Sequence, residues 1–433
     1  MIRKLRNNKF LSSTLLLLIG GVFGKVVGFI LKIIVTRMLG SENMGVYSLL
    51  SPTASLLSTI AVFSYPNAIS KVVSEGNDND KVFFSVSIFS ILFNLIIMFV
   101  VILSSSFISN YLLHESRLYY PIIVLAISLP FVSFSSIIKG FFWGKQNMFP
   151  YMLSNFIEQV TRLLLIVLFL EYFISINLSS TISFILIVNI IGEIVSQFVM
   201  ILFIKRRKFH FSFSFSHLKS VLSFSIPSTC SRLIGSFAYF LEPIVLNKSL
   251  IFMGYTSNYI IYEYGIINAY SLSLLLMPQF FIQNMSTSLI PELSKNYKNH
   301  NYSLCISRIK QIIFISVLIG VFSTLIICLF PKYFLNLIFH TYEGYHYIKI
   351  LSPFVILFYI EYPLINALQA IGASKKAMKC SVIGSIVRLL SIALFSLLNF
   401  GMYSYILSII INLIVCTLLY YLELKRILVH SHN

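Results

Sequence analysis

Charged side chains are scarce in this sequence. Only 11% of the 433 residues are Asp, Glu, Lys or Arg, whereas 58% are hydrophobic. A soluble domain of this size needs far more charge on its surface, and no polar segment is long enough to form a separate soluble domain. The composition therefore excludes a soluble globular protein and indicates a chain that lies largely in lipid.

Cysteine and reactive motifs are also sparse. The five cysteines are odd in number and scattered, mostly within apolar runs, so they form neither a disulfide framework nor a metal-ligand spacing. The sequence holds no phosphate-binding P-loop, no HExxH and no GxSxG motif. These absences argue against an enzyme, including a membrane-embedded transferase or polymerase, and we expect no cofactor and no metal.

Long apolar runs are what the chain does contain. Because a spanning helix needs about 20 apolar residues, hydropathy predicts twelve transmembrane helices. The basic N-terminus and the apolar run after it look like a signal peptide, but no small-residue cleavage site follows, so we interpret them as a retained first span. The predicted spans are residues 13–38, 46–70, 82–103, 119–142, 152–172, 181–204, 220–246, 265–290, 311–330, 347–370, 379–398 and 402–422.

Lysine and arginine alternate in abundance from one loop to the next. Of the 32 basic residues, 22 fall on the side of the N-terminus, five on the opposite side and five within spans. This asymmetry follows the positive-inside rule, which predicts cytoplasmic N- and C-termini in a multi-pass protein of the plasma membrane. The formal net charge of +18 then faces anionic lipid headgroups, and no nucleic-acid partner is needed.

The two halves of the chain repeat short motifs in the same order. A cation precedes a glycine by three residues in FGKVVGF and again in CSRLIGSF, and the matching segments SLPFVSF and LSPFVILF lead on to Arg162 and Arg388. We interpret this pattern as two six-helix lobes, residues 1–208 and 209–433, related by a parallel pseudo-twofold repeat. Parallel repeats with a binding site at their interface are a transporter architecture.

Basic residues in the first span are the strongest functional signal. Lys25 lies about 18 Å into its helix, and a charge at that depth costs about 2.5–3.5 kcal/mol on insertion scales. Lys32 follows nearly two turns later and points the same way, and Arg232 is the repeat counterpart of Lys25. The alternatives are salt bridges inside a lobe, or headgroup contacts for Lys32 and Arg37. We predict an anion-binding substrate cavity lined by Lys25, Lys32, Arg37 and Arg232.

Other spans carry ionisable residues with less clear roles. Glu158 and Arg162 are four residues apart, in the order that favours an i,i+4 pair, so a structural pair is the stronger interpretation. Arg388 has no acid at the equivalent position, because Gly384 stands there. Each remaining acid is either a core residue or a site that couples transport to protons or sodium ions. These acids are Glu193 and Glu361, which we interpret as lone buried acids, and Glu242, which lies ten residues after Arg232 on the same helix.

Several segments resemble one known family. RMLGSENMGVY, the PNAISK ending of the second span, GKQNMFPYMLSNFIEQVTR and LQAIGASKKAM are similar to those of stage V sporulation protein B and its relatives. This is the polysaccharide-transport family of the multidrug/oligosaccharidyl-lipid/polysaccharide (MOP) flippase superfamily, and the resemblance covers nearly the whole chain. It implies a two-lobed, MATE-like all-α fold that alternates between inward and outward openings. It also implies that Lys25, Lys32 and Arg37 hold a substrate diphosphate. Relatives commonly have fourteen spans, whereas twelve are predicted here.

The function that these observations predict together is that of a flippase. It would move an anionic polyprenyl-diphosphate-linked sugar, a precursor of peptidoglycan or another polysaccharide, from the inner to the outer leaflet. The setting would be spore-cortex or cell-wall synthesis, with cell-wall synthesis enzymes as candidate partners. The alternatives are a cation-coupled multidrug or small-solute exporter of the same fold and a non-transporting scaffold for cell-wall enzymes. A cationic drug would favour an acid-lined pocket, whereas the deep residues of the first span are basic.

Overall fold

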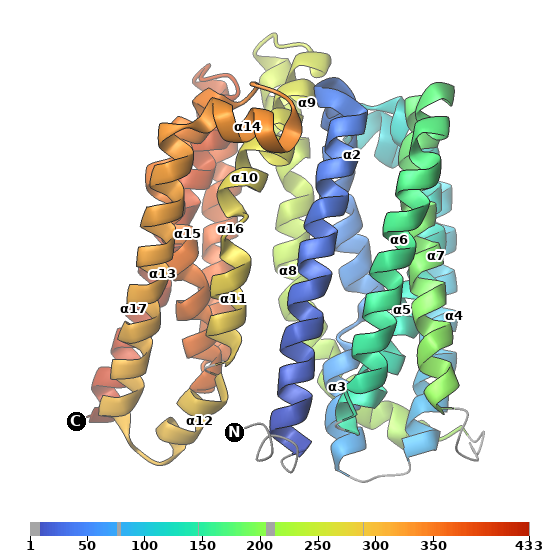
Figure 1. Cartoon of the computed structure of the whole chain (residues 1–433), viewed down its shortest axis with the longest axis vertical. Coiled ribbons are helices and arrows are strands. Elements are labelled where there is room, and N and C mark those ends of the chain that lie inside the picture. The colour runs from blue at the N-terminus through green and yellow to red at the C-terminus, as the bar shows by residue number, and fades with distance from the viewer. Residues whose placement is uncertain (1–8, 76–78, 146, 205–212, 289, 433) are drawn as a thin grey trace. The chain divides into compact units, whose positions relative to one another are not determined.

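The fold is helical throughout the part of the chain that the computed structural model describes, residues 9–75, 79–145, 147–204, 213–288 and 290–432 (Figure 1). Eight stretches in these ranges are long and apolar enough to cross a membrane. The protein is therefore an all-α, multi-pass membrane protein, while the count of twelve spans and the location of the termini stay predictions. The eight stretches are Asp80–Leu112, Ser116–Gly144, Phe149–Ile176, Leu178–Ile204, Tyr302–Leu329, Tyr345–Ala370, Ser374–Leu397 and Tyr403–Leu428.

The spanning helices carry large apolar side chains on their outer faces. Leu103, Leu168 and Phe322 are 70%, 68% and 70% exposed. In water such exposure would be costly, but a lipid environment accepts it, because a helix satisfies its own backbone hydrogen bonds and presents only side chains to the hydrocarbon. The exposed leucines and phenylalanines on these eight stretches are thus suited to a surface that faces lipid.

Contacts divide the chain into two compact units. Unit 1 comprises Met1–Leu39 and Leu50–Phe240, and unit 2 comprises Gly40–Leu49 and Leu241–Asn433. The chain therefore passes from one unit to the other three times. The predicted lobe boundary at residue 208 falls within 205–212, outside the described residues, and the two predicted six-helix lobes stay a prediction.

Unit 1 contains four long helices that run side by side in Figure 1: α4 (Asn79–Ser106), α5 (Tyr119–Gly144), α6 (Phe149–Ile176) and α7 (Leu178–Ile204). Helix α5 packs against α4, α7 and the short α3 (Tyr65–Ser74), and α6 packs against α7. At Gly140 a Cβ atom would lie 2.8 Å from the Cα atom of Pro66, so a glycine allows α3 to approach α5.

Two backbone breaks alter the first two predicted spans. Helix α2 (Lys9–Val62) continues through both of them but is kinked at Gly40, where φ is 71° and ψ is 175°. Only glycine adopts this conformation readily. Phe63 and Ser64 then take positive φ values of 47° and 51° before α3 begins. The predicted span 46–70 is therefore divided between the end of α2 and α3.

Unit 2 repeats the helix pairing of unit 1. Its long helices are α13 (Tyr302–Leu329), α15 (Tyr345–Ala370), α16 (Ser374–Leu397) and α17 (Tyr403–His432). Helix α15 packs against α13 and α17, and α16 packs against α17, just as α5 packs against α4 and α7 and α6 packs against α7. The two units thus share one order of helix contacts, while the parallel repeat of two six-helix lobes stays a prediction.

Shorter elements connect the long helices. The predicted span 265–290 is divided into three pieces, with a break at Met277 and Pro278. Proline favours such a break, because it has no backbone N–H to donate within a helix. Helix α8 (Phe215–Phe252) starts in unit 1 and ends in unit 2. The other elements are η1 (Phe107–Leu112), η2 (Ser116–Leu118), α9 (Ser257–Gly265), η3 (Ile266–Ser271), α10 (Leu272–Leu276), α11 (Gln279–Ser288), α12 (Ile290–Lys298) and α14 (Pro331–Phe339).

The segment Gly40–Leu49 joins unit 2 through a backbone contact at Gly45. A Cβ atom built on Gly45 would lie 2.5 Å from the carbonyl oxygen of Ile261, and one built on Gly265 would lie 2.3 Å from the Cα atom of Gly45. Because glycine has no side chain, the backbones of α2 and α9 can touch here.

Candidate functional site

The predicted anion-binding residues lie on α2 and α8. Lys25, Lys32 and Arg37 of α2 and Arg232 of α8 are all exposed, and all four belong to unit 1. Seven helical residues turn about 700°, so Lys25 and Lys32 differ by only about 20° in direction, whereas Arg37 points about 120° away from Lys25. The two lysines therefore share a face that Arg37 does not.

Open space lies beside the cation in both copies of the repeated motif. A Cβ atom built at Gly28, one turn after Lys25, would meet no atom within 4 Å. The same is true at Gly235, one turn after Arg232. Gly24, by contrast, faces α6, because a Cβ atom there would lie 2.9 Å from Nδ2 of Asn155. One side of α2 thus contacts α6, while none of the described residues lies against α2 at Gly28.

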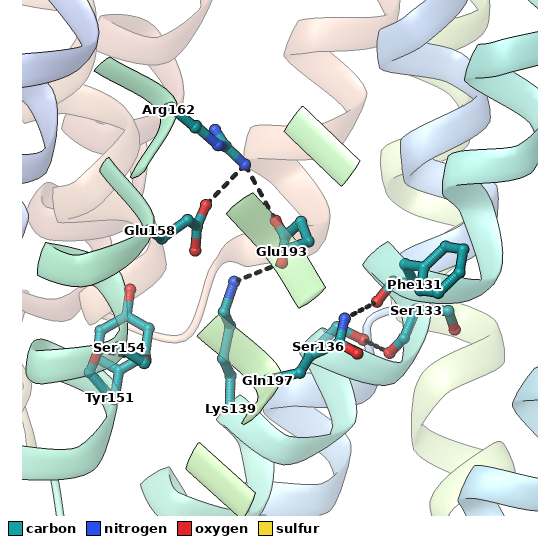
Figure 2. A network of polar contacts seen from close by, with 10 residues as sticks. All are labelled: Phe131, Ser133, Ser136, Lys139, Tyr151, Ser154, Glu158, Arg162, Glu193 and Gln197. Carbon is teal, nitrogen blue, oxygen red and sulfur yellow. Dashed lines mark hydrogen bonds and ion pairs between the residues drawn. The ribbon is translucent and has the colours of Figure 1, made fainter. Parts of the chain in front are cut away.

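A largely buried network of four charged side chains lies within unit 1, with Glu158 buried and the other three half-buried (Figure 2). On α6, Nη2 of Arg162 lies 2.7 Å from Oε1 of Glu158, so the i,i+4 pair suggested by the spacing is present. The same Nη2 atom lies 3.6 Å from Oε1 of Glu193 on α7, and Nζ of Lys139 on α5 lies 3.5 Å from Oε2 of Glu193. Glu193 therefore bridges two cations and is not the lone acid that the sequence suggested.

The network is electrically balanced. It holds two carboxylates and two cations, and Glu158 is only 4% exposed. Leaving one buried charge without its partner is strongly unfavourable, whereas a complete set of opposite charges is tolerated. Two carboxylates and two cations are thus a stable combination in lipid, and the pairing ties α5, α6 and α7 together.

Glycine at position 192 makes room for the guanidinium group. A Cβ atom on Gly192 would lie 2.7 Å from Nε and 2.9 Å from Cγ of Arg162. Near the network, Nε2 of Gln197 on α7 donates a hydrogen bond of 2.7 Å to the carbonyl oxygen of Phe131, adjacent to Pro130 on α5. These contacts fix how α7 lies against α5 and α6 (Figure 2).

Unit 2 holds a different network around Arg388, the repeat counterpart of Arg162. Nη2 of Arg388 on α16 lies 2.8 Å from Oε2 of Glu242, near the end of α8, which is 4% exposed. The sequence indicated no acid near Arg388, because its own helix has Gly384 where Glu158 would be. Arg388 also attracts the carboxylate of Glu361 on α15. The acids here come from other helices.

Cys416 explains why the acid is not on α16. A Cβ atom on Gly384 would lie only 2.0 Å from Sγ of Cys416 on α17, so position 384 has no room for a carboxylate. Cys416 occupies the space between α16 and α17, the helices that correspond to α6 and α7, where unit 1 has Glu158 and Glu193. The repeat therefore keeps the arginine but changes its acidic partners.

A chain of hydrogen bonds extends from Arg388 to the π-helix η3. Nη2 of Arg388 donates to the hydroxyl oxygen of Tyr405 at 3.4 Å, and the Tyr405 hydroxyl donates to Oδ1 of Asn268 at 3.2 Å. Nδ2 of Asn268 in turn donates to the carbonyl oxygen of Tyr264 at 2.9 Å. A π-helical turn is often found at functional positions, and here it connects to the half-buried Arg388.

Three participants in these networks are absent from the sequence prediction. Lys139 lies three residues before the end of the predicted span 119–142, and its place inside that span is the signal that could have revealed it. Tyr405 and Asn268 carry no such signal, because tyrosine and asparagine are common in this chain. In the described residues, no group of three or more His, Cys, Asp and Glu side chains could hold a metal ion.

Comparisons with known proteins identify the family. The sequence profile of the family described as "Polysaccharide biosynthesis protein" matches residues 10–297. The chain is 28% identical over 436 residues to stage V sporulation protein B of Bacillus subtilis (strain 168). The aligned region covers 97% of this chain and 84% of that protein.

Solved structures share the fold at low sequence identity. An inward-facing multidrug resistance MATE family transporter of the MOP superfamily has a TM-score of 0.76 and 16% identity, covering 94% of this chain and 95% of that one. The lipid II flippase MurJ in an inward closed conformation has a TM-score of 0.72 and 16% identity, covering 94% of this chain and 87% of that one. Because the family profile spans most of the sequence, this chain belongs to the polysaccharide biosynthesis protein family and has the fold of the MOP superfamily.

Proposed function

We propose that this chain is a flippase that moves a lipid-linked sugar bearing a diphosphate from the inner to the outer leaflet of the plasma membrane. The observation that carries the proposal is the pair of exposed lysines, Lys25 and Lys32, on one face of α2 beside the open space at Gly28. Cations at this depth of a predicted span attract anions strongly. A diphosphate is such an anion, and the family to which the chain belongs is named for polysaccharide biosynthesis.

The proposed mechanism needs no covalent chemistry. Lys25 and Lys32 bind the diphosphate while the cavity is open to the cytoplasm, with Arg232 as the third predicted cation, and alternating access then exposes the substrate to the outside. Movement of negative charge outward is favoured by an inside-negative membrane potential, by about 2.3 kcal/mol per charge for each 100 mV. Arg37 is less suited to this role, because it does not share the lysine face.

The relatives support a cell-wall substrate. One is named stage V sporulation protein B and another structural relative is named a lipid II flippase. We therefore infer a peptidoglycan precursor as the substrate class, with cell-wall synthesis enzymes as partners and both termini in the cytoplasm. The multidrug transporter among the structural relatives supports the alternative, a small-solute exporter.

Flipping of a labelled polyprenyl-diphosphate sugar in reconstituted vesicles tests the proposal. The native chain is expected to expose the label on the far leaflet, and Lys25→Ala is expected to slow this by about 10-fold to 100-fold, since a hydrogen bond to a charged group contributes about 1.5–3 kcal/mol. Lys219→Ala, which removes an exposed lysine of α8 outside the predicted spans, is the matched control and should flip at the native rate.

Two outcomes would contradict this proposal at different levels. If the native chain flips no polyprenyl-diphosphate sugar and instead exports a cationic dye from the same vesicles, the exporter alternative holds. If Lys25→Ala and Lys25→Arg both flip at the native rate, the transport activity stands but Lys25 does not bind the substrate.

We also propose that the network of unit 2 couples transport to a proton or sodium gradient. In this network the carboxylate of Glu242 pairs with Arg388 at 2.8 Å, and the carboxylate of Glu361 on α15 is attracted by the same guanidinium group without a direct ion pair among the described contacts. The network of unit 1 balances its acids one to one, so the excess carboxylate lies in unit 2. A carboxylate in excess can take up a cation without disturbing an existing pair.

Glu361→Gln removes the excess carboxylate and keeps the Glu242 pair. We expect this variant to retain flipping down a substrate gradient but to lose any acceleration by an imposed proton or sodium gradient, measured in the same vesicles. Glu423→Gln, which breaks the more exposed pair with Lys376 at 3.3 Å, should keep the acceleration. A Glu361→Gln variant that responds to both gradients like the native chain would exclude this coupling site.

A further inference from the structure

Helix α14 lies at the end of unit 2 where α13 stops and α15 starts (Figure 1). The charge asymmetry predicts this end to be outside the cell. One side of the helix is buried, with Pro331, Leu335 and Phe339 at every fourth position. The opposite side presents Tyr333 and Leu337, which are 62% and 54% exposed. A short helix with tyrosine and leucine on its exposed side fits the boundary between headgroups and acyl chains.

A polar edge of α14 lies next to this exposed apolar side. Lys332 and Asn336 are one turn apart and both exposed. Each precedes one of the apolar pair, Tyr333 and Leu337, by one residue, so the two edges differ by about 100° around the helix. The helix therefore presents a cation and an apolar surface side by side. An anionic phospholipid has the same two parts, a charged phosphate and a hydrocarbon chain.

Two ammonium groups approach one tyrosine ring beside α14. Nζ of Lys332 lies 4.6 Å from the ring centroid of Tyr345, the first residue of α15. Nζ of Lys349, one turn further along α15, lies 5.9 Å from the same centroid. The face of the ring attracts each ammonium group, but the ring carries no net charge and leaves the two cations repelling each other. An anion that contacts both lysines would remove this repulsion.

Carboxylates of the chain do not neutralise these two cations. Within the described ranges, neither Lys332 nor Lys349 forms an ion pair with Asp or Glu. Glu343, in the connection between α14 and α15, instead accepts a hydrogen bond of 2.8 Å from the hydroxyl group of Tyr262 on α9. The positive charge of the two exposed lysines is therefore available to an anion from outside the chain.

The connection from α14 to α15 is held in place by unit 2. The carbonyl oxygen of Gly344 accepts a hydrogen bond of 3.0 Å from Oγ of Ser271 in η3. The ring of Phe339 lies against that of Tyr270, also in η3, with centroids 5.4 Å apart. These contacts fix the backbone on both sides of the connection. They keep the two lysines close together before a ligand arrives, which lowers the entropic cost of binding.

We propose that α14 and the start of α15 bind an anionic phospholipid of the outer leaflet. Its phosphate contacts the ammonium groups of Lys332 and Lys349, and an acyl chain lies along Tyr333 and Leu337. A free phosphate ion would use the charges alone, whereas a phospholipid also covers the apolar side of α14. Binding here needs neither transport nor the lysines of α2, so this site is independent of the proposed flippase activity.

Photolabelling in nanodiscs of zwitterionic phosphatidylcholine tests the proposal. The two probes carry the same diazirine in one acyl chain, and they are a phosphatidylglycerol and a diacylglycerol that has no phosphate. We expect the phosphatidylglycerol to label peptides from residues 329–350 about tenfold more than the diacylglycerol, because each lysine near the membrane surface attracts anionic lipid. The Lys332→Ala/Lys349→Ala double variant should lower the phosphatidylglycerol labelling to the level of the diacylglycerol.

Two further variants control for location and folding. Lys248→Ala removes an exposed lysine near the end of α8, on the same predicted side of the membrane, so labelling should not change. Lys332→Arg/Lys349→Arg keeps both charges and should retain most of the labelling.

Three results would overturn the proposal. The first is equal labelling of the native chain by the phosphatidylglycerol and the diacylglycerol. The second is full labelling of the double alanine variant at a native melting temperature. The third is complete displacement of the phosphatidylglycerol by inorganic phosphate at millimolar concentration, which would show that the site takes free phosphate and gains nothing from the acyl chain.

Discussion

The substitution Arg162→Met is expected to lower the free energy of unfolding by about 3–5 kcal/mol. Removing one partner of a buried ion pair leaves an uncompensated charge. The variant would leave Glu158, which is 4% exposed, and Glu193 with only Lys139 to balance them. Chemical denaturation of the purified protein, followed by its helical signal, measures the loss.

The double variant Glu158→Gln/Arg162→Met sharpens this test. It removes one carboxylate with the guanidinium and leaves the pair of Lys139 and Glu193, so most of the lost stability should return. Arg308→Met is the control, because it breaks an ion pair with Glu292 in which the two side chains are 43% and 41% exposed. It is expected to lower the free energy of unfolding by no more than about 1 kcal/mol. If the single and the double variant are equally unstable, Arg162 stabilises the protein through its packing and not through charge balance.

A Gly265→Val variant is expected to lose about 4 kcal/mol or more of stability. The new Cβ atom would lie 2.3 Å from the Cα atom and 2.6 Å from the nitrogen of Gly45. These are backbone atoms, so no side-chain rotation relieves the clash, and α9 must separate from Gly40–Leu49. The melting temperature of the purified protein and the yield of folded protein in the membrane report this loss.

Gly235→Ala is the matched control for this substitution. A Cβ atom at Gly235 would meet nothing within 4 Å, and alanine is favoured over glycine inside a helix by about 0.5–1 kcal/mol. The control should therefore be as stable as the native chain or slightly more stable. A Gly265→Ala variant that melts at the native temperature would show that the contact between α2 and α9 is not needed.

Hydropathy was sufficient to predict the long helices, because lipid requires about 20 apolar residues in each span. The long helices from α4 to α7 and from α13 to α17 all correspond to predicted spans. Breaks caused by backbone conformation were harder to locate. The positive φ values at Phe63 and Ser64 have no glycine to mark them, and they divide a span that looks continuous in the sequence.

Polar contacts were predictable only when both partners lay on one helix. The spacing of Glu158 and Arg162 is a local property of α6, and it indicated their pairing. The pairs of Arg388 with Glu242 and of Lys139 with Glu193 join residues that are 146 and 54 positions apart. Such contacts depend on which helices pack together, and no periodicity in one sequence contains that information.

Because Gly40–Leu49 belongs to unit 2, this segment is synthesised long before the residues that it contacts. Gly45 contacts Ile261, which is made 216 residues later. A ribosome that adds 5–20 residues per second needs about 10–40 s for this length. During that interval the helices of unit 1 from Leu50 to Phe240 are made, while the segment Gly40–Leu49 of unit 2 waits without its partner. Slowing translation after residue 49 therefore lengthens the time for which Gly40–Leu49 lacks its partner.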